Sequence, residues 1–598
     1  MSQETRTLVS RSSFLLLFSD STSRILASRA EEDMIGVAVG PEEGLARRCW
    51  IKFRNELVFS MFTPFVICLA SGNLKIESFG HFIAQDVFFL RAFKQAYELV
   101  EECADDDEAK SLIRKLRNDV TKELDLLDFF MSELKFDPVH KITTRSTNST
   151  TIKYTDFLVA TASGKIEGEK GPVTIATPFE KTKVAAYTLG AMTPCMRLYA
   201  FLGKEIQSLL VLDPDDSNHL YKKWVDNYSS ESFEASALQT EDLLDKLSVS
   251  LTGEELEVIE KLYHQSMKLE IDFFSAQPVY QRTIVPLFRV DDPVELRLII
   301  FSDFDLTCTV LDSSAILAEI AIITASKTDQ SGTENQLSWK SSADLRNTWG
   351  DLSRQYTEEY EQCIESILPI EKVKEFDYEG LCKAIEQVSD FEKRANSRVT
   401  ESGVLKGLNV EDIKRAGEHL ILQDGCTGFF QKIVKNKKLN ADVHILSYCW
   451  CGDLIRSAFS SGGLDVLNVH TNEFTYEESI STGEIVKKVE SPIDKVQAFK
   501  DILNNCSNDG KHLTVYIGDS MGDLLCLLEA DVGIVIGSSS SLRRLGCQFG
   551  VSFIPLFSGL VKKQRKIMEG GSSNWKGLTG ILYTVSSWAE IHAFILGP

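Results

Sequence analysis

The sequence lacks any apolar run of the ~18 residues that a membrane-spanning helix needs, and it has no excess of basic residues. Of its 598 residues, 64 are Lys or Arg and 87 are Asp or Glu, which gives a formal net charge of -23. Nucleic acids and anionic membranes both bind basic surfaces, so we expect neither as a partner. We expect small-molecule substrates instead, including anionic ones that a bound metal ion would hold.

The cysteines lack a pattern as well. The 13 cysteines are scattered, and none forms a Cys-x-x-Cys pair. In a chain of this size, this indicates free thiols in a reducing compartment.

The first 30 residues hold only two acids, Glu4 and Asp20, and are rich in Ser and Arg. We therefore expect residues 1–35 to be a mitochondrial transit peptide or a disordered tail. A second start at Met34 would leave a cytoplasmic form.

The periodicity of apolar residues changes once along the chain. Residues 40–288 contain stretches with helical spacing, such as "GHFIAQDVFFLRAFKQAYELV", and predict an all-α domain. Residues 294–598 contain short β-rich runs separated by helical stretches, which predict an α/β domain with a parallel, Rossmann-like sheet. About residues 312–440 are mostly helical and too long for a plain crossover. We interpret them as a helical cap over the strand ends.

Polar side chains follow the predicted strands where ligands bind in such sheets. Asp303 and Asp305 follow "LRLIIFS", and Ser447 and Asp519 each follow a later strand. With Lys495, these groups suit a phosphate held on Mg²⁺. We expect Asp303 to attack phosphorus. Asp305 would give a proton to the leaving oxygen and then take a proton from the water that releases phosphate.

The remaining roles follow from the same arrangement. Ser447 and Lys495 would hold phosphate oxygens. The metal ligands would be Asp303, Asp305 and Asp519. Asp523 would hold these ligands in position without binding the metal itself.

The motifs "DFDLT", Ser447, Lys495 and "GDSMGDLLCL" resemble, in order, the four motifs of the haloacid dehalogenase superfamily of phosphatases. The resemblance covers residues 296–598 and implies a magnesium-dependent phosphomonoesterase. The motif lysine is assigned to Lys495 because it ends the stretch "SPIDK" at a predicted helix start, although Lys487, Lys488 and Lys500 lie nearby. The position of the cap resembles the phosphoserine phosphatase and pyrimidine nucleotidase branches.

The helical half offers scattered polar candidates that, taken singly, are ordinary core residues: Asp86, Tyr154, Cys195, Tyr199, Tyr228 and Glu270. Together with "FIAQDVFFLRAF", "GAMTPCMRLYAFLG" and "KLEIDFFSA", they resemble the TenA, or thiaminase II, family of aminopyrimidine hydrolases. That resemblance implies Cys195 as the nucleophile, Glu270 as the proton carrier and Asp86 as the group that binds the pyrimidine. The three tyrosines would line the pocket. This chain has Phe88 and Phe89 where the family often carries a tyrosine.

The order of the two halves resembles the bifunctional thiamine-salvage proteins of plants. That resemblance implies a phosphatase acting on thiamine monophosphate and a helical domain that releases hydroxymethylpyrimidine. It also implies a homo-oligomer formed through the helical domain. The alternative is a pyrimidine-nucleotide phosphatase whose helical domain only binds thiamine or assembles oligomers. Trp450, close to Ser447, would either stack on a flat substrate ring or pack in the core.

Overall fold

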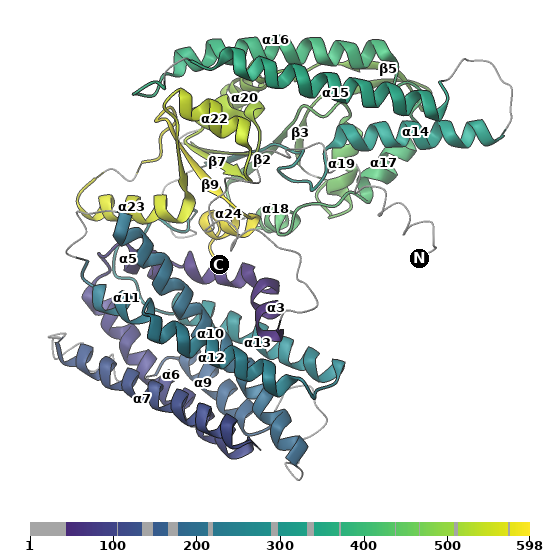
Figure 1. The fold of residues 1–598 in the computed structure, drawn as a ribbon. Helices are drawn as coiled ribbons and strands as arrows, with labels where there is room; N and C mark the ends of the chain where they lie inside the picture. The colour runs from purple at the N-terminus through teal and green to yellow at the C-terminus, as the bar shows by residue number, and fades with distance from the viewer. Residues whose placement is uncertain are drawn as a thin grey trace.

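The computed structural model describes residues 44–598 except 105, 134–146, 166–177, 213–218, 289–296, 332–339, 370–371, 437, 466, 507–511 and 572–573. The predicted transit peptide therefore lies outside the described residues, as does part of the boundary between the two domains. No helix in the described part of the chain is both long and apolar enough to cross a bilayer. The predicted fold class is confirmed, because a helical domain precedes an α/β domain (Figure 1).

The first domain is a bundle of long helices built around α10 (Pro178–Leu212), which packs against α6, α9, α12 and α13. Its other helices are α3 (Leu45–Lys52), α4 (Arg54–Met61), α5 (Pro64–Ala70), α6 (Ile76–Cys103), α7 (Asp107–Glu133), α9 (Ser149–Ala162), α11 (Lys222–Tyr228), α12 (Glu231–Ser248) and α13 (Gly253–Ser275). The N-terminus of α13 is fixed by a capping box between Thr252 and Glu255. The buried faces of these helices carry the large aromatic residues of the core.

The second domain contains a seven-stranded sheet with the order β3-β2-β1-β6-β7-β9-β8, and every pairing in it is parallel. Its strands are β1 (Arg297–Ser302), β2 (Ala441–Leu446), β3 (Asn468–His470), β6 (His512–Gly518), β7 (Val532–Ile536), β8 (Ser552–Pro555) and β9 (Ile581–Val585). Because β1 lies between β2 and β6, the residues that follow these three strands meet at one edge of the sheet.

Helices connect and cover these strands: α19 (Gly452–Ser460), α20 (Pro492–Cys506), α21 (Leu524–Glu529), α22 (Ser540–Gln548), α23 (Leu556–Met568) and α24 (Trp588–Ile595). The short 3₁₀ helix η5 (Met521–Asp523) follows β6. Burial on both faces of the sheet explains why its central strands are almost wholly apolar.

The cap consists of α14 (Ser313–Ser331), α15 (Ser342–Ile367) and α16 (Tyr378–Ser402), which lie over the sheet domain (Figure 1). The end of the segment that we assigned to the cap instead belongs to the sheet domain. There α17 (Val410–Glu418) packs on α19, and α18 (Cys426–Lys435) packs on α24. A hairpin of β4 (Glu473–Glu477) and β5 (Ile480–Val486), which the sequence did not predict, contacts α16.

The two domains share a packed interface. Helix α23 contacts α5, and α24 contacts α4. The Phe62 and Phe557 rings lie 5.8 Å apart across it. The buried Gln564 side chain accepts a hydrogen bond from the Ile284 backbone amide at 2.9 Å and donates one to the Arg282 carbonyl at 3.0 Å. The apolar core is therefore continuous between the domains.

Candidate active sites

Three carboxylates gather where β1 and β6 end. Asp303 directly follows β1, Asp519 directly follows β6, and Asp523 ends the 3₁₀ helix after it. One oxygen of each lies within 4.8 Å of the others, so this cluster has the spacing of a cation site. Oδ1 of Asp519 also accepts a hydrogen bond from Thr307 Oγ1 at 2.8 Å. Thr307 is the final residue of the "DFDLT" motif, and the sequence analysis gave it no role.

Lys495, on α20, is fully buried between two of these carboxylates. Its Nζ lies 3.0 Å from Oδ1 of Asp303 and 2.7 Å from Oδ1 of Asp523. It also lies 4.3 Å from the centre of the Tyr448 ring. Of the four candidate lysines, Lys495 is therefore the one beside Asp303, while Lys487 and Lys500 pair with glutamates elsewhere.

Asp523 has a different environment from its two neighbours. Its Oδ1 accepts hydrogen bonds from Lys495 and from Tyr516 at 2.9 Å. Its Oδ2 accepts bonds from the backbone amide and the hydroxyl of Ser520 at 3.1 and 3.0 Å. Since both oxygens are occupied by the protein, Asp523 is suited to hold Lys495 in place. In contrast, the contacts of Asp303 with Lys495 and with the Phe304 amide both use Oδ1, which leaves Oδ2 without a hydrogen-bond partner among the described residues.

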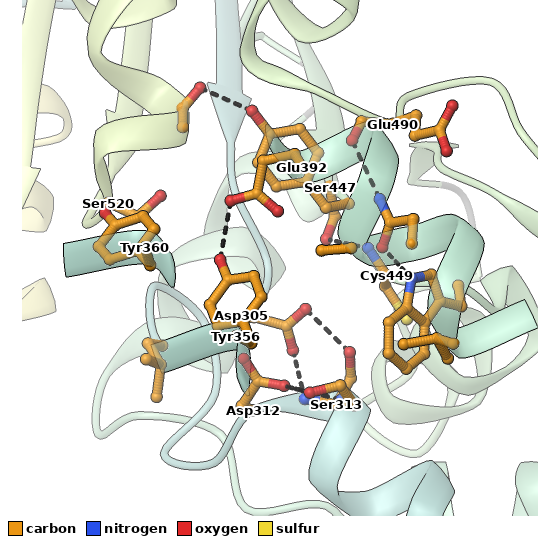
Figure 2. A pocket seen from close by; sticks show the side chains of 18 of the residues that line it. Asp305, Asp312, Ser313, Tyr356, Tyr360, Glu392, Ser447, Cys449, Glu490 and Ser520 are labelled. Carbon is orange, nitrogen blue, oxygen red and sulfur yellow. Dashed lines mark hydrogen bonds between the residues drawn. The ribbon is translucent and has the colours of Figure 1, made fainter. Parts of the chain in front are cut away.

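Asp305 and Ser447 line the same cavity, but the Asp305 carboxylate lies outside the three-carboxylate cluster. Instead, it accepts hydrogen bonds from the backbone amide and hydroxyl of Ser313 at 2.7 and 2.9 Å (Figure 2). We predicted that the Asp305 carboxylate would lie beside those of Asp303 and Asp519. In the structure, the turn into α14 places it against Ser313, at the start of the cap. The Ser447 hydroxyl accepts a hydrogen bond from the Cys449 amide at 3.1 Å.

The electrostatics of the cluster favour a bound cation. Burial raises the pKa of Asp303 to about 7, and the Asp523 charge adds to this effect while Lys495 opposes it. Burial, followed by the charges of Asp523 and Asp303, also raises the pKa of Asp519 well above its usual range. Burial lowers the pKa of Lys495, but the Asp303 and Asp523 charges outweigh it and the pKa is raised. Carboxylate oxygens crowded in this way are the ligands that Mg²⁺ prefers, so these residues fit a magnesium ion.

A second group of polar side chains is buried inside the helical domain. Tyr154, on α9, donates a hydrogen bond to Oε1 of Glu270, on α13, at 2.7 Å. The Cys195 thiol, on α10, lies close enough to Glu270 for each group to shift the pKa of the other. Burial raises the pKa of Glu270 to about 7, and it raises the pKa of Cys195 well above its usual range, with the Glu270 charge adding to the effect. The raised pKa of Cys195 favours the neutral thiol, and Glu270 is the carboxyl group placed beside it.

Asp86, Tyr199 and Tyr228 belong to the same group. Asp86 is buried, and its Oδ2 has no hydrogen-bond partner among the described residues, which suits a group that binds a polar ligand. The Tyr199 and Tyr228 rings lie 5.0 Å apart. Tyr228 donates a hydrogen bond to Glu123 at 2.5 Å. All six predicted residues of this half are buried, and they are brought together from α6, α9, α10, α11 and α13.

Sequence reasoning missed Glu123. Burial raises its pKa to about 7, and its charge raises the pKa of Asp86 and of Cys195. It lies on α7 in the charged stretch "RNDVTKELD", which resembles a solvent-exposed face. Of the two residues that depart from the family pattern, Phe89 is buried, and its ring lies 4.6 Å from the Tyr154 ring.

Comparison with known proteins decides the family. The chain is 63% identical, over 97% of its length and 94% of the relative's, to a protein of Arabidopsis thaliana named "Bifunctional TH2 protein, mitochondrial". The chain belongs to the TH2 family of bifunctional proteins. Within this TH2-family chain, residues 60–166 and 179–280 match the model of the TENA/THI-4/PQQC family. The predicted family is thereby confirmed.

Other proteins are similar to only part of the chain. An aminopyrimidine aminohydrolase of Staphylococcus aureus is 25% identical over 35% of the TH2-family chain and 83% of its own length. A solved TenA homologue of P. horikoshii is 20% identical over 39% of this chain and 97% of that chain, with a TM-score of 0.31. A phosphoserine phosphatase structure is 17% identical over 42% of this chain and 91% of that chain, with a TM-score of 0.25.

Proposed function

We propose that the protein is a bifunctional hydrolase of thiamine metabolism. Its α/β domain hydrolyses thiamine monophosphate to thiamine and phosphate with Mg²⁺, and its helical domain hydrolyses aminopyrimidines to hydroxymethylpyrimidine. The family membership supports two activities, and the aminopyrimidine aminohydrolase relatives support the second. The single observation that carries the phosphatase is the meeting of Asp303, Asp519 and Lys495 at one edge of the sheet.

The α/β domain supplies every group that phosphate transfer requires. Asp303 and Asp519 would hold Mg²⁺, which when bound would offset the negative charge of the phosphate as the carboxylate approaches. An oxygen of Asp303 forms a bond to phosphorus, and the bond from phosphorus to the alcohol oxygen breaks. Asp305 gives its proton to the departing oxygen. Ser447 and Lys495 hold the phosphate oxygens during this transfer.

A water molecule then completes the reaction. Asp305, now a carboxylate, takes a proton from the water as the water oxygen bonds to phosphorus. The bond between phosphorus and Asp303 breaks, which returns the carboxylate and releases phosphate. Asp305 regains its proton in this step, so both carboxyl groups end as they began.

The helical domain supplies a nucleophile and a proton carrier. The Cys195 thiol passes its proton to Glu270 and its sulfur bonds to the electron-poor pyrimidine ring. Asp86 binds the ring nitrogen and amino group through its unpartnered oxygen. The amino group of the substituent leaves as ammonia with the proton from Glu270, and a water oxygen bonds to the carbon that it left while Glu270 takes a proton from that water. The bond between sulfur and the ring then breaks, and Glu270 returns its proton to Cys195. Tyr154 positions Glu270 through the 2.7 Å hydrogen bond, and the buried Tyr199 and Tyr228 rings would line the substrate site.

A phosphate-release screen tests the phosphatase. The purified full-length protein is given thiamine monophosphate, uridine monophosphate and cytidine monophosphate in turn, with Mg²⁺ and after removal of divalent metal by EDTA. We expect the highest kcat/KM for thiamine monophosphate, and no phosphate release after EDTA treatment. Faster hydrolysis of the nucleotides would favour the alternative of a pyrimidine-nucleotide phosphatase. Aminopyrimidine hydrolysis should survive EDTA, because its residues include no predicted metal ligands.

Location and assembly are part of the proposal. The Arabidopsis relative carries "mitochondrial" in its name, which supports a mitochondrial protein with a cytoplasmic form as the second possibility. A fluorescent fusion of the full chain, compared with one that starts at Met34, tests this. We also propose a homo-oligomer formed through the helical domain, which light scattering of the full-length protein measures directly.

A further inference from the structure

The cavity above the strand ends extends well beyond the phosphate groups. Its volume is about 390 Å³, which is within the ~300–1,000 Å³ of small-molecule sites. One side is formed by the carboxylates after β1 and β6, and the other by the cap helices α15 and α16. The cap side includes Trp349, Tyr356 and Tyr360 of α15 and Glu392 and Asn396 of α16, and the cavity is also lined by Trp450, which follows β2 in the sheet domain. The organic half of a phosphomonoester would therefore lie against the cap.

The cap side offers flat aromatic surfaces. The Tyr356 and Tyr360 rings, one turn apart on α15, are nearly parallel, with an interplanar angle of 14° and centroids 5.8 Å apart. Trp450 lies edge-on to Trp349 at 6.2 Å and donates a hydrogen bond to the Asn396 side chain at 3.2 Å. Surfaces of this kind bind planar rings, and they favour cationic rings over neutral ones.

Glu392, on α16, adds a negative charge to this aromatic wall. It accepts a hydrogen bond from the Tyr356 hydroxyl at 2.7 Å, and Figure 2 shows the two side chains joined in the cavity. No Lys or Arg of the described chain forms an ion pair with it, whereas Arg398 in the same wall is paired with Glu359 at 2.6 Å. Burial raises the pKa of Glu392 to about 7, which is the behaviour of a carboxyl group that lacks a positive partner.

The other charges of the cavity have partners of their own. Glu490 is paired with Lys487 at 2.5 Å. Asp312 accepts hydrogen bonds from the backbone amide and hydroxyl of Ser314. Among the described residues that line this cavity away from the catalytic edge, Glu392 is thus the carboxyl group that combines an aromatic neighbour with the lack of a cation.

We propose that Glu392, held by Tyr356, is a specificity-determining residue that selects phosphomonoesters whose organic half is a planar, positively charged ring. This rests on the proposed phosphatase function of the site around Asp303. The thiazolium ring of thiamine monophosphate has this chemistry, and the neutral pyrimidine base of a nucleotide does not. The carboxylate and the tyrosine rings contact the ring while the phosphate lies at Asp303, so the cap selects the substrate without taking part in the transfer.

The test compares two substrates in the full-length protein with Mg²⁺. The readout is the ratio of kcat/KM for thiamine monophosphate to kcat/KM for p-nitrophenyl phosphate, whose ring is neutral. Loss of a hydrogen bond or ion pair to a charged group changes affinity about tenfold or more, so we expect Glu392→Gln to lower this ratio at least tenfold. Glu392→Asp should recover part of the loss. Glu386→Gln, an exposed position on the same helix, is the matched control and should leave the ratio unchanged.

A second measurement does not require the variant to turn over thiamine monophosphate. Thiamine should inhibit hydrolysis of p-nitrophenyl phosphate by the wild-type protein more strongly than thiochrome, its neutral oxidation product. Tyr356→Phe loses the hydroxyl that holds Glu392 and keeps the ring. In this variant, the inhibition by thiamine and the inhibition by thiochrome should become more similar.

The outcomes separate the two proposals. An unchanged substrate ratio in Glu392→Gln, or equal inhibition by thiamine and thiochrome, would overturn the role of Glu392 while leaving the phosphatase intact. A wild-type protein that hydrolyses p-nitrophenyl phosphate but not thiamine monophosphate would instead overturn the proposed substrate.

Discussion

Replacing Lys495 with Met removes the single positive charge that the structure places between Asp303 and Asp523. The ammonium lies 3.0 and 2.7 Å from these carboxylates and is fully buried. Removing one partner of a buried ion pair costs about 3–5 kcal/mol. The Asp303 carboxyl can relieve part of this by taking up a proton, because its pKa is already raised to about 7. We therefore expect a loss of about 3 kcal/mol in the free energy of unfolding of the α/β domain.

The same substitution should affect catalysis more than stability. Lys495 would hold a phosphate oxygen as negative charge spreads over it, and removing one such group lowers kcat about 10²–10³-fold. The Asp303 carboxyl would also be protonated more often and would attack less often. Phosphate release and thermal denaturation of the full-length protein measure the two effects. Hydrolysis of aminopyrimidines by the same preparation shows whether the helical domain is intact.

Lys500→Met is the matched control, because Lys500 lies on the same helix, one and a half turns later. Its ion pair with Glu529, at 2.8 Å, is partly exposed to solvent, and such pairs contribute about 0–1 kcal/mol. We expect this variant to keep its phosphatase activity. If Lys495→Met lowered kcat no more than Lys500→Met does, the role of Lys495 in holding phosphate would be wrong.

Three further predictions follow from the two sites. Asp303→Asn should lower phosphate release at least about 10³-fold, because the amide cannot attack phosphorus; a variant within tenfold of wild type would contradict the covalent route. Cys195→Ser should lower aminopyrimidine hydrolysis at least about 10²-fold and leave phosphate release unaffected, and full aminopyrimidine hydrolysis would contradict Cys195 as the nucleophile. Burial raises the pKa values of Glu123 and Glu270 from 4.5 to about 7, so the stability that their protonation contributes is present below about pH 4.5 and is lost as the pH rises through about 7. Thermal denaturation at pH 5 and pH 8 should therefore show a loss on the order of 3 kcal/mol per group in the wild type and a smaller loss in Glu123→Gln and Glu270→Gln; an equal loss in the variants would refute the assignment.

The central strands and the groups at their ends were predictable from the sequence. Their apolar runs are continuous because both faces of the sheet are buried, and Asp303, Ser447 and Asp519 each directly follow such a run. The strands β3, β8 and β9 were missed. The first has three residues, and the other two include exposed positions, so neither gives a continuous apolar signal.

The contacts around these groups could be predicted less well from the sequence. Spacing alone predicted that Asp305 shares the metal with Asp303, whereas the turn into α14 brings its carboxylate to Ser313. Glu123 lies in a charged helical stretch, and its burial becomes visible only when α7 packs against α6. Glu392 lies in the cap, 55 residues before Ser447, which is the nearest catalytic motif along the chain, so its position in the cavity depends on tertiary structure.

The most direct test of the phosphatase mechanism is a chemical trap for the bond between Asp303 and phosphorus. Borohydride reduces an acyl phosphate of aspartate to homoserine, which peptide mass spectrometry locates in the sequence. When the full-length protein is quenched with borohydride during turnover of thiamine monophosphate with Mg²⁺, we expect homoserine at position 303, and none there without substrate. Unmodified Asp303 in an enzyme that is releasing phosphate, or homoserine at another aspartate, would contradict the account.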